Sequence, residues 1–545
     1  MKKDCVVETD LGPLRECRIE HIALSPLTRA GINRFADEPG FAPLAVAGIP
    51  FSCTALIRHR LPFRELRLNI GGALSGRVCP VASVVFPEQG TLIPDIVGEP
   101  EPVSVGGNTT AMFLLKLNLP ADTPPGKYAV TVHAKAASHE PARRTFTLHV
   151  LPPVETAANE QKVVFWPHWE TFCRYLKLEL WSEEFWTAAE CCLREMAAGG
   201  MNVIMASICH DPFRYPLPPE YHAFNHYPSM IRWMKDSGGY WRFDYSVYDR
   251  YVELNMRLGI DREIECHSLL PCKCQDPVLC FYDADNRLIQ QPTSCDSPEY
   301  QEAWTAFLAD FIVHNRSRGW ADKLTLCPYD EPQDPASFRQ VARLAKSVAP
   351  EIRITAAITT KKALELVDVI DIATVHLSSG YDAESFAKLR EAGIEVRWYN
   401  CCAPDWGNVL FASELSDAYR LAWMTEAGGF TGFLRWSIID WPEQVLSNPG
   451  FNWPTGDTHL LYPGPRGPLE SLRWHAYKQG RGDLALLLYL GNDALLKSFG
   501  ACAPVEWNCT PGEIQQCLYQ AYRRHLRLTS AEAALTTEQL LTETL

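Results

Sequence analysis

Residues 324–332 read LTLCPYDEP, a short apolar run that leads into the adjacent carboxylates Asp330 and Glu331 and stops at Pro332. The run predicts a buried strand. Successive strand residues point to opposite faces, so both carboxylates can reach one pocket only where the strand ends and bends, and a proline marks such an end. The alternative is that these residues open a helix, because the helix dipole favours acidic side chains in the first turn.

The chain around this stretch alternates between apolar runs and helical patterns. Eight buried strands are predicted, at residues 163–166, 202–207, 260–266, 323–327, 352–358, 369–375, 394–399 and 432–436. Helical patterns separate most of them, and the one over 182–198 is capped by Ser182 and ends at Gly199. Eight strands alternating with helices over roughly 300 residues are typical of a (β/α)8 barrel. A doubly wound open sheet is the competing arrangement, but no glycine-rich phosphate-binding motif follows any strand.

The residues before the first barrel strand follow a different pattern. Short alternating runs such as 110–119 and 127–136 are separated by Pro/Gly turns, which is typical of a β-sandwich. The predicted fold class is therefore α/β: a β-sandwich domain (1–155), a (β/α)8-barrel catalytic domain (160–498) and a short helical C-terminal extension (499–545).

Composition narrows the class of protein. The 545 residues are 47 % hydrophobic and 21 % charged, which is an ordinary globular composition. The formal net charge is −14, and no basic block occurs, so neither nucleic acid nor an anionic membrane is expected as a partner. The chain has no apolar run of eighteen residues and no apolar segment behind its first lysines. We therefore expect a cytoplasmic protein whose 19 cysteines are mostly free thiols.

Several cysteines raise the question of a metal site. Cys266-His267, Cys272-x-Cys274 and Cys280 lie within a short stretch, but structural zinc sites show paired C-x2–4-C spacing. We therefore expect no metal and no other cofactor. The adjacent pair Cys401-Cys402 is expected to be two ordinary thiols, because no C-x-x-C motif occurs.

The active site of a (β/α)8 barrel forms at the carboxyl ends of its strands. The predicted strand ends carry His168, Trp169, His210, Asp211, His267, Asp330, Glu331, His376, Trp398, Tyr399, Trp436, Asp440 and Trp441. Aromatic rings stack on the faces of sugars, acids move protons, and polar groups read hydroxyls. The set therefore favours a sugar-cleaving pocket.

Seven stretches together resemble one known family. They are IPDIV (93–97), LPADTPPGKYAVTV (119–132), YDEP (329–332), RWYNCCAP (397–404), FLRWSIIDWPE (433–443), NWPTGDTHLLYPG (452–464) and PLESLRWHAYKQGRGD (468–483). The chain is similar in them to glycoside hydrolase family 123, the exo-β-N-acetylgalactosaminidases. Two positions depart from the family pattern. GRGD (480–483) stands where an acidic stretch is expected, and Tyr329 stands where small residues are common.

The resemblance implies a substrate-assisted, retaining hydrolysis that releases terminal β-linked N-acetylgalactosamine. The 2-acetamido oxygen of the substrate is then the nucleophile, which makes the family an exception to the scheme with two catalytic carboxylates. Glu331 would be the general acid and then the general base. Asp330 would orient the acetamido N–H and stabilise the oxazolinium-like intermediate. Tyr399 is the candidate donor to the acetamido carbonyl.

The remaining candidates are assigned to substrate binding. Trp398, Trp436 and Trp441 are candidate walls of the sugar pocket, Asp440 and Asp457 candidate partners of sugar hydroxyls, and His168, His210 and His376 weaker candidates. Each has a structural alternative, because buried tryptophans and hydrogen-bonded histidines are normal core residues. Two other functions stay open: a glycosidase of the same fold that acts on another sugar, such as β-N-acetylglucosamine, and a non-catalytic glycan-binding protein.

Overall fold

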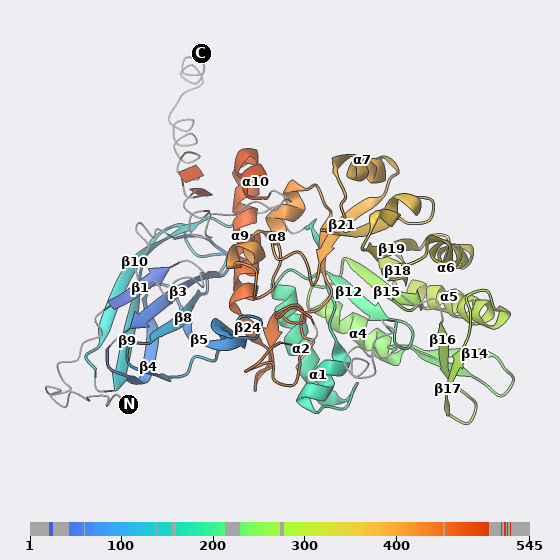
Figure 1. The fold of residues 1–545 in the computed structure, drawn as a ribbon, viewed down its shortest axis with the longest axis horizontal. Coiled ribbons are helices and arrows are strands. Elements are labelled where there is room, and N and C mark those ends of the chain that lie inside the picture. Colours follow the sequence, from blue (N-terminus) through green and yellow to red (C-terminus); the bar gives the residue numbers. More distant parts are fainter. Residues whose placement is uncertain are drawn as a thin grey trace, which may run out of the picture.

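Eight short apolar strands close into a parallel barrel, which confirms the barrel predicted from the sequence (Figure 1). In barrel order they are β11 (Lys162–Phe165), β12 (Val203–Ser207), β15 (Glu263–Leu270), β18 (Leu324–Tyr329), β19 (Arg353–Ile358), β20 (Ile372–His376), β21 (Glu395–Asn400) and β22 (Gly432–Arg435). The computed structural model describes residues 21–25, 43–58, 60–137, 139–154, 160–212, 229–272, 277–450, 453–500 and six positions between 514 and 524. The predicted extension over 499–545 falls almost entirely outside the described residues.

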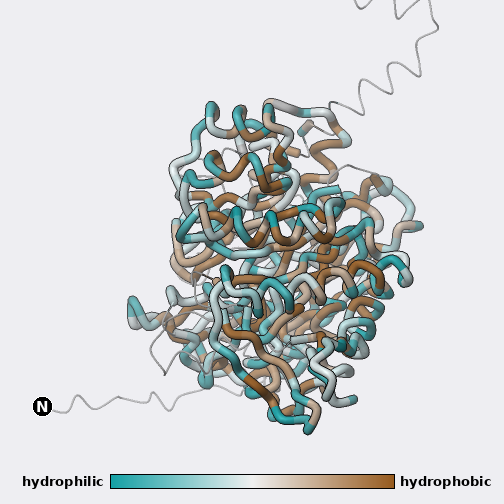
Figure 2. The backbone as a smooth tube through the Cα atoms, turned by 90° about the vertical axis from the view of Figure 1, so that its right-hand side faces the viewer, coloured by the Kyte–Doolittle hydropathy of each residue, from teal (hydrophilic) through white to brown (hydrophobic). Residues whose placement is uncertain are grey.

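Helices surround the barrel, and two more, α9 and α10, follow its last strand in the sequence. They are α1 (Trp169–Leu176), α2 (Glu183–Ala198), α4 (Ser246–Arg257), α5 (Pro298–Arg318), α6 (Pro335–Val348), α7 (Ala383–Glu391), α8 (Leu415–Ala427), α9 (Leu472–Tyr489) and α10 (Asp493–Phe499). Hydroxyl caps start several of them: the Ser182 side chain accepts from the backbone N–H of Phe185 at 3.1 Å. Polar and apolar stretches alternate along the chain (Figure 2). The outer helix α6 buries Phe338, Val341, Ala342 and Ala345, whereas α8 and α9 are buried over most of their length. Between β19 and β20 the connection holds only a short 3-10 helix, η5 (Lys361–Glu365).

Two further sheets lie beside the barrel (Figure 1). The first has the order β1-β3-β8-β5-β6-β24-β23 and the second β2-β10-β9-β4-β7. Their strands are β1 (His21–Ser25), β2 (Leu44–Val46), β3 (Phe51–Arg58), β4 (Phe63–Gly72), β5 (Gly76–Phe86), β6 (Thr91–Val97), β7 (Val103–Val105), β8 (Thr110–Leu117), β9 (Gly126–Ala137), β10 (Ala142–Leu151), β23 (Leu461–Tyr462) and β24 (Leu469–Ser471). Alternate residues of both sheets, such as Leu115 and Val132, form one apolar core.

Two strands of the first sheet, β23 and β24, follow the last barrel strand in the sequence. β24 pairs antiparallel with β6 through Ser471 and Ile96, and β23 extends the same edge. The predicted boundaries near residues 155 and 498 remain a proposal, and the strand pairing crosses the one near residue 155. The sequence did not indicate this exchange, because β23 and β24 are only two and three residues long.

A small four-stranded sheet is inserted into the barrel loops that follow β12 and β15. It has the order β14-β13-β16-β17, with strands β13 (Arg232–Lys235), β14 (Trp241–Asp244), β16 (Val278–Tyr282) and β17 (Leu288–Pro292). Trp233 of this sheet stacks on Phe307 of α5 with ring centroids 4.4 Å apart, which fastens the insert to the barrel's outer layer. The insert was not predicted from the sequence.

The barrel interior has a charged floor and an apolar middle. At the amino end of the strands Arg397 donates to both carboxylate oxygens of Glu263, at 2.9 and 2.7 Å, and its Nε donates to Glu395 at 2.9 Å. Burial opposes the ionisation of Glu395, but Arg397 and Arg353 lower its pKa to about 2. Above this floor an apolar cluster that includes Trp166, Met205 and Leu434 fills the centre. Side chains therefore fill the barrel at its amino end and in its middle.

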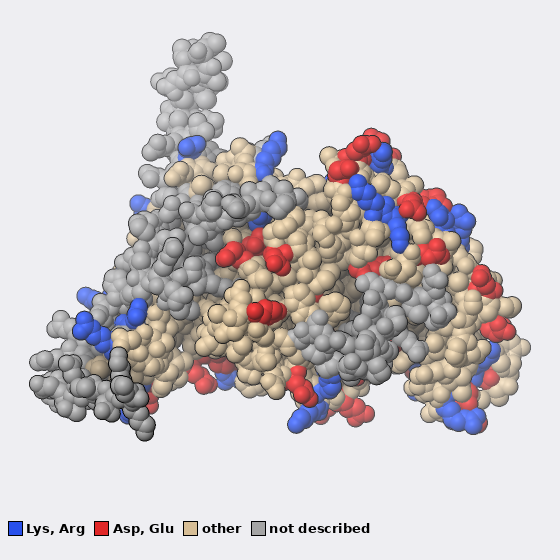
Figure 3. All heavy atoms as spheres, viewed as in Figure 1, with Lys and Arg blue, Asp and Glu red and all other residues tan. Residues whose placement is uncertain are grey.

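The described surface carries both signs of charge, interspersed over the face shown in Figure 3. Many of these charges pair, as in Arg339 with Asp368 at 3.1 Å. No helix in the described parts of the chain combines the length and the apolarity that crossing a bilayer requires.

Candidate active site

Asp330 and Glu331 lie directly after β18, at the carboxyl edge of the barrel. Asp330 is 4 % exposed and Glu331 is half-buried. The backbone bends sharply here, because Glu331 has a φ of 44° and its N–H donates to the carbonyl of Ala357 in β19 at 3.0 Å. A non-glycine residue in the left-handed region is costly and is found where the surrounding structure fixes it, frequently in active sites. The bend is the strand end that the sequence predicts.

The acidic pair does not open the following helix. α6 begins at Pro335, and its cap is Asp334, whose carboxylate accepts from the backbone N–H of Ser337 at 2.8 Å. The helix-start interpretation therefore applies to Asp334, and Asp330 and Glu331 are left to the barrel edge.

Tyr399 connects the pair to a strand further round the barrel. Its hydroxyl donates to Oε1 of Glu331 at 2.7 Å. Tyr399 lies in β21, whereas Glu331 follows β18, and these strands are separated by β19 and β20. Burial raises the pKa of Tyr399 well above 10, and the neighbouring charges of Glu331 and Asp330 raise it further. Tyr399 is therefore a neutral hydrogen-bond donor at the centre of the edge.

His376, at the end of β20, lies next to Tyr399. The two rings meet edge to face with centroids 4.8 Å apart. One ring nitrogen of His376, Nδ1, is 2.8 Å from the hydroxyl oxygen of Ser378, and Nε2 is 3.4 Å from Sγ of Cys401. These contacts fix the ring beside the acidic pair.

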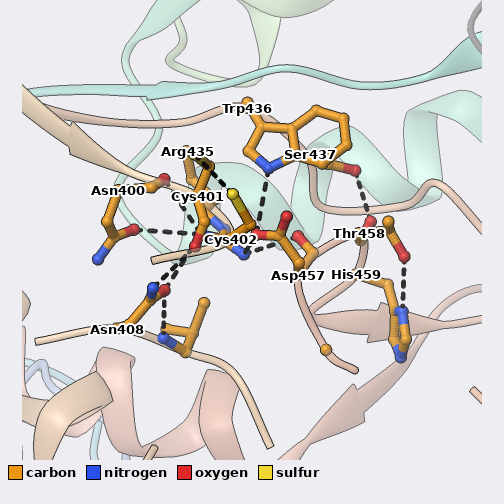
Figure 4. Close-up of polar contacts among 12 residues, drawn as sticks. Asn400, Cys401, Cys402, Asn408, Arg435, Trp436, Ser437, Asp457, Thr458 and His459 are labelled. Atoms are coloured by element: carbon orange, nitrogen blue, oxygen red, sulfur yellow. Dashed lines mark hydrogen bonds and ion pairs between the residues drawn. The ribbon is translucent and has the colours of Figure 1, made fainter. Parts of the chain in front are cut away.

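Trp436 follows β22 and is held by a buried polar group (Figure 4). Its indole N–H donates to Oδ1 of Asp457 at 3.2 Å, and the same oxygen accepts from Arg435 at 2.6 Å. Burial raises the pKa of Asp457, and the charge of Arg435 opposes that rise. Because successive residues of β22 alternate, Arg435 faces away from the barrel axis while Trp436 continues the inward series. Asp457 therefore bridges the outside and the inside of the barrel edge.

His168 supports the other side of Trp436. Its Nε2 is 2.9 Å from the carbonyl oxygen of Trp436, and the two rings meet edge to face at 5.3 Å. Burial lowers the pKa of His168 to about 4, so this ring is neutral near pH 7. The structure thus brings together Asp330, Glu331, His376, Tyr399, Trp436, Asp457 and His168 at one edge.

Other predicted residues lie elsewhere. Trp398 points away from the barrel axis, where its indole N–H donates to Thr425 of α8 at 2.9 Å. Trp441 is 1 % exposed and donates to the carbonyl of Leu461 at 2.8 Å. Both rings belong to the core between the barrel and its helices.

Asp440 and His210 have other surroundings. Asp440 is buried, and burial raises its pKa to about 7 against a hydrogen bond from Thr171. His210 is exposed and borders a small hollow, together with Cys209, Trp233 and Tyr300. The hollow lies beside the inserted sheet.

Of two inward residues of β15, Glu265 was not selected from the sequence, whereas His267 was named at a strand end and beside Cys266. Glu265 accepts from, or shares a proton with, Nε2 of His267 at 2.9 Å, and His267 meets Trp166 edge to face at 5.0 Å. Burial raises the pKa of Glu265, but His267 and Arg397 lower it below its usual value. The spacing of Glu265 and His267 by two residues was the available signal, because such residues share one face of a strand. In the described ranges, no three His, Cys, Asp or Glu side chains gather as metal ligands.

Two kinds of comparison find known proteins that are similar to this chain. The family model described as "Glycoside hydrolase 123, catalytic domain" matches residues 166–490. A family 123 glycoside hydrolase from Clostridium perfringens, solved in a study of glycolipid glycan hydrolysis, is 20 % identical. The similarity covers 93 % of this chain and 100 % of that one, with a TM-score of 0.78. A family 39 glycoside hydrolase from Bacteroides cellulosilyticus WH2 is 12 % identical over 82 % of each chain, with a TM-score of 0.35. No curated protein matches the sequence.

Proposed function

The chain belongs to glycoside hydrolase family 123, and on that premise we propose that it releases terminal β-linked N-acetylgalactosamine from glycans. We propose a retaining, substrate-assisted mechanism, in which the 2-acetamido group of the substrate is the nucleophile. Asp330 and Glu331 are the proposed catalytic residues, and no cofactor takes part.

One observation carries the proposal: the 2.7 Å hydrogen bond between the Tyr399 hydroxyl and Oε1 of Glu331, with Asp330 buried beside it. A hydrolase that relies on its substrate's acetamido group needs an acid, an acetamido-orienting carboxylate and a neutral donor within one small pocket. These three groups meet at the barrel edge. A mechanism with a protein nucleophile would instead need two carboxylates on opposite sides of the sugar, about 5–5.5 Å apart.

In the first step Glu331 gives its proton to the glycosidic oxygen while the acetamido oxygen attacks the anomeric carbon. The bond to the leaving group breaks, and an oxazolinium ion forms. Asp330 accepts a hydrogen bond from the acetamido N–H and balances the positive charge that develops. When substrate binds, the Tyr399 hydroxyl turns its single proton from Glu331 to the acetamido oxygen and fixes the direction of attack of that oxygen. Holding the acetamido oxygen in the direction of attack raises its effective molarity and so lowers the activation barrier of this step.

In the second step water attacks the anomeric carbon from the side that the leaving group has left. Glu331, now a carboxylate, takes a proton from that water and returns to its starting form. The oxazolinium ring opens and restores the acetamido group. The sugar keeps its β configuration because the anomeric carbon has been inverted twice. Trp436 offers a ring for the sugar's apolar face, and Asp457, His376 and His168 hold this wall in place.

The substrate class is tested with a panel of 4-nitrophenyl β-glycosides. We expect fastest release from the N-acetylgalactosaminide, little from the N-acetylglucosaminide and none from the plain galactoside, which lacks the acetamido group. Proton NMR of the first turnover should show the β anomer of the free sugar. Because the Clostridium perfringens relative was studied on glycolipid glycans, an oligosaccharide taken from a glycolipid belongs in the panel.

Three results would contradict the proposal. Equal cleavage of the galactoside would show that the acetamido group is not the nucleophile. Preference for the N-acetylglucosaminide would leave the mechanism intact and change the sugar. Binding of N-acetylgalactosamine without turnover of any glycoside would assign a glycan-binding role.

A further inference from the structure

We infer that Asp95, in a strand outside the barrel, is a positioning residue for the barrel's sugar pocket. It acts through Arg473 on two loops that leave the carboxyl edge of β21 and β22. The inference rests on the proposed function, because it assigns the pocket wall around Trp436 to sugar binding. Asp95 itself touches no substrate.

Asp95 holds Arg473 in a buried ion pair. Asp95 lies in β6 and is fully buried, and Arg473, in α9, is 1 % exposed. The carboxylate accepts from Arg473 Nε at 3.0 Å and from the Tyr462 hydroxyl at 2.7 Å, and Arg473 Nη2 lies 3.0 Å from it as an ion pair. Separating such a pair leaves a buried charge without a partner, which costs free energy. The guanidinium of Arg473 therefore stays beside Asp95.

The remaining donor of Arg473 reaches both loops. Its Nη1 donates to the carbonyl of Val409, in the loop after β21, at 2.7 Å. The same nitrogen donates to the carbonyl of Gly456, in the loop after β22, at 3.0 Å. Gly456 has a φ of 90°, and a Cβ there would come within 2.9 Å of this nitrogen. Glycine at 456 thus allows the loop to lie directly on the guanidinium.

The residues next to these carbonyls hold the pocket wall (Figure 4). Asp457 follows Gly456 and accepts from Arg435 and from the indole N–H of Trp436. Asn408 precedes Val409, accepts from Arg435 at 3.2 Å, and donates to the carbonyl of Cys401 at 2.8 Å. The contacts therefore run without a gap from Asp95 to the wall of the proposed sugar site.

A second contact from the same sheet fastens one of these loops. Glu88, in the turn between β5 and β6, accepts from the backbone N–H of Thr455 at 2.9 Å and from its hydroxyl at 2.7 Å. The carbonyl of Thr455 accepts from the N–H of Phe411 at 2.8 Å, which joins the two loops to each other. Glu88 is exposed, whereas Asp95 is buried, so the two contacts can be tested separately.

The test compares Asp95→Asn and Glu88→Gln with Glu470→Gln as a matched control. Glu470 also joins the sheets to the barrel side, but its partners Lys116, His475 and Lys478 lie outside both loops. The readouts are hydrogen–deuterium exchange of residues 403–412 and 453–460, and kcat and KM on the glycoside that the unmodified protein cleaves best.

We expect Asp95→Asn to speed exchange in both loops and to lower kcat/KM by about 10–100-fold, with most of the loss in KM. The ratio of rates for two leaving groups stays as in the unmodified protein, because Glu331 lies outside this network. Glu88→Gln folds normally, speeds exchange in 453–460 and raises KM. Glu470→Gln lowers the melting temperature and leaves both loops and KM unchanged.

The inference is wrong if Asp95→Asn and Glu88→Gln leave the exchange of both loops at its original rate. It is also wrong if Glu470→Gln loosens the loops as much as Asp95→Asn does. If Asp95→Asn does not fold, Tyr462→Phe, which removes one hydrogen bond from the Asp95 carboxylate, decides: it should speed exchange in both loops, and unchanged exchange would refute the inference. Failure to release N-acetylgalactosamine would refute the proposed function alone, because exchange of the loops is measured without substrate.

Discussion

Asp330 and Glu331 are neighbours in the chain, and their proposed roles are separable by the chemistry of the leaving group. Glu331→Gln removes proton transfer, so the loss should be large with a poor leaving group and smaller with an activated aryl group. Asp330→Asn keeps the acid but weakens the orientation of the acetamido group, so its loss should persist with both. One proton-transfer function corresponds to about 10²–10⁴ in rate, or roughly 3–5 kcal/mol.

The measurement is kcat/KM on two N-acetylgalactosaminides that differ only in leaving-group pKa. The opposite pattern, a leaving-group-sensitive Asp330→Asn and an insensitive Glu331→Gln, would exchange the two roles. Normal turnover by both variants would place the active site elsewhere.

Asp440 predicts a pH-dependent stability. Burial raises its pKa to about 7, so between about pH 4 and pH 7 the folded protein holds a proton that the unfolded chain has released. The free energy of unfolding therefore falls as the pH rises through this range, by about 2–4 kcal/mol from this residue. Asp440→Asn removes the charge, so it should gain stability relative to the unmodified protein at pH 8 and not at pH 5. Urea unfolding of both proteins at the two pH values checks this, and an equal difference at both values would contradict it.

At the scale of an element, β21 carries two neighbouring aromatic residues with opposite environments. Tyr399 faces the barrel axis and Glu331, whereas Trp398 faces Thr425 of α8. Tyr399→Phe should lower kcat by roughly 10²-fold, because one hydrogen-bond donor at the reacting group is lost, and should leave the melting temperature almost unchanged. Trp398→Phe should cost about 1–3 kcal/mol of stability and leave kcat unchanged. Paired kinetics and thermal unfolding test this contrast, and a catalytic loss in Trp398→Phe would overturn it.

The same strand shows how far the sequence can predict the site. The apolar runs locate all eight barrel strands, because buried parallel strands are continuously apolar, and the strand ends then place Asp330, Glu331 and Tyr399. The alternation of strand residues also implies that Trp398 and Tyr399 cannot share a face. The Arg397–Glu263 pair could not be predicted, because 134 residues separate its partners. The inserted sheet was missed because its short strands are largely half-buried or exposed, so they lack the continuous apolar runs of the barrel strands.

At the scale of the whole molecule, the sheets and the barrel are predicted to unfold together. β24 follows the barrel strands in the sequence but pairs with β6 of the first sheet. Arg473, which also follows the barrel, has its carboxylate partner, Asp95, in β6. Calorimetry should therefore show one transition for the full chain. A fragment that begins at residue 160 should fail to fold, because it leaves Arg473 without Asp95, at a cost of about 3–5 kcal/mol. Two resolved transitions, or a stable fragment, would contradict this.

The pairing of β6 with β24 also sets an order of events during synthesis. Val97 pairs with Glu470, about 370 residues later in the chain. At about 5–20 residues per second, a ribosome needs roughly 20–75 s to make the intervening chain. During that time the edge of β6 is an unpaired strand, which other chains can join. The protein's yield in a cell should therefore respond to translation speed and to chaperones that cover nascent strands, even where its final stability is unchanged.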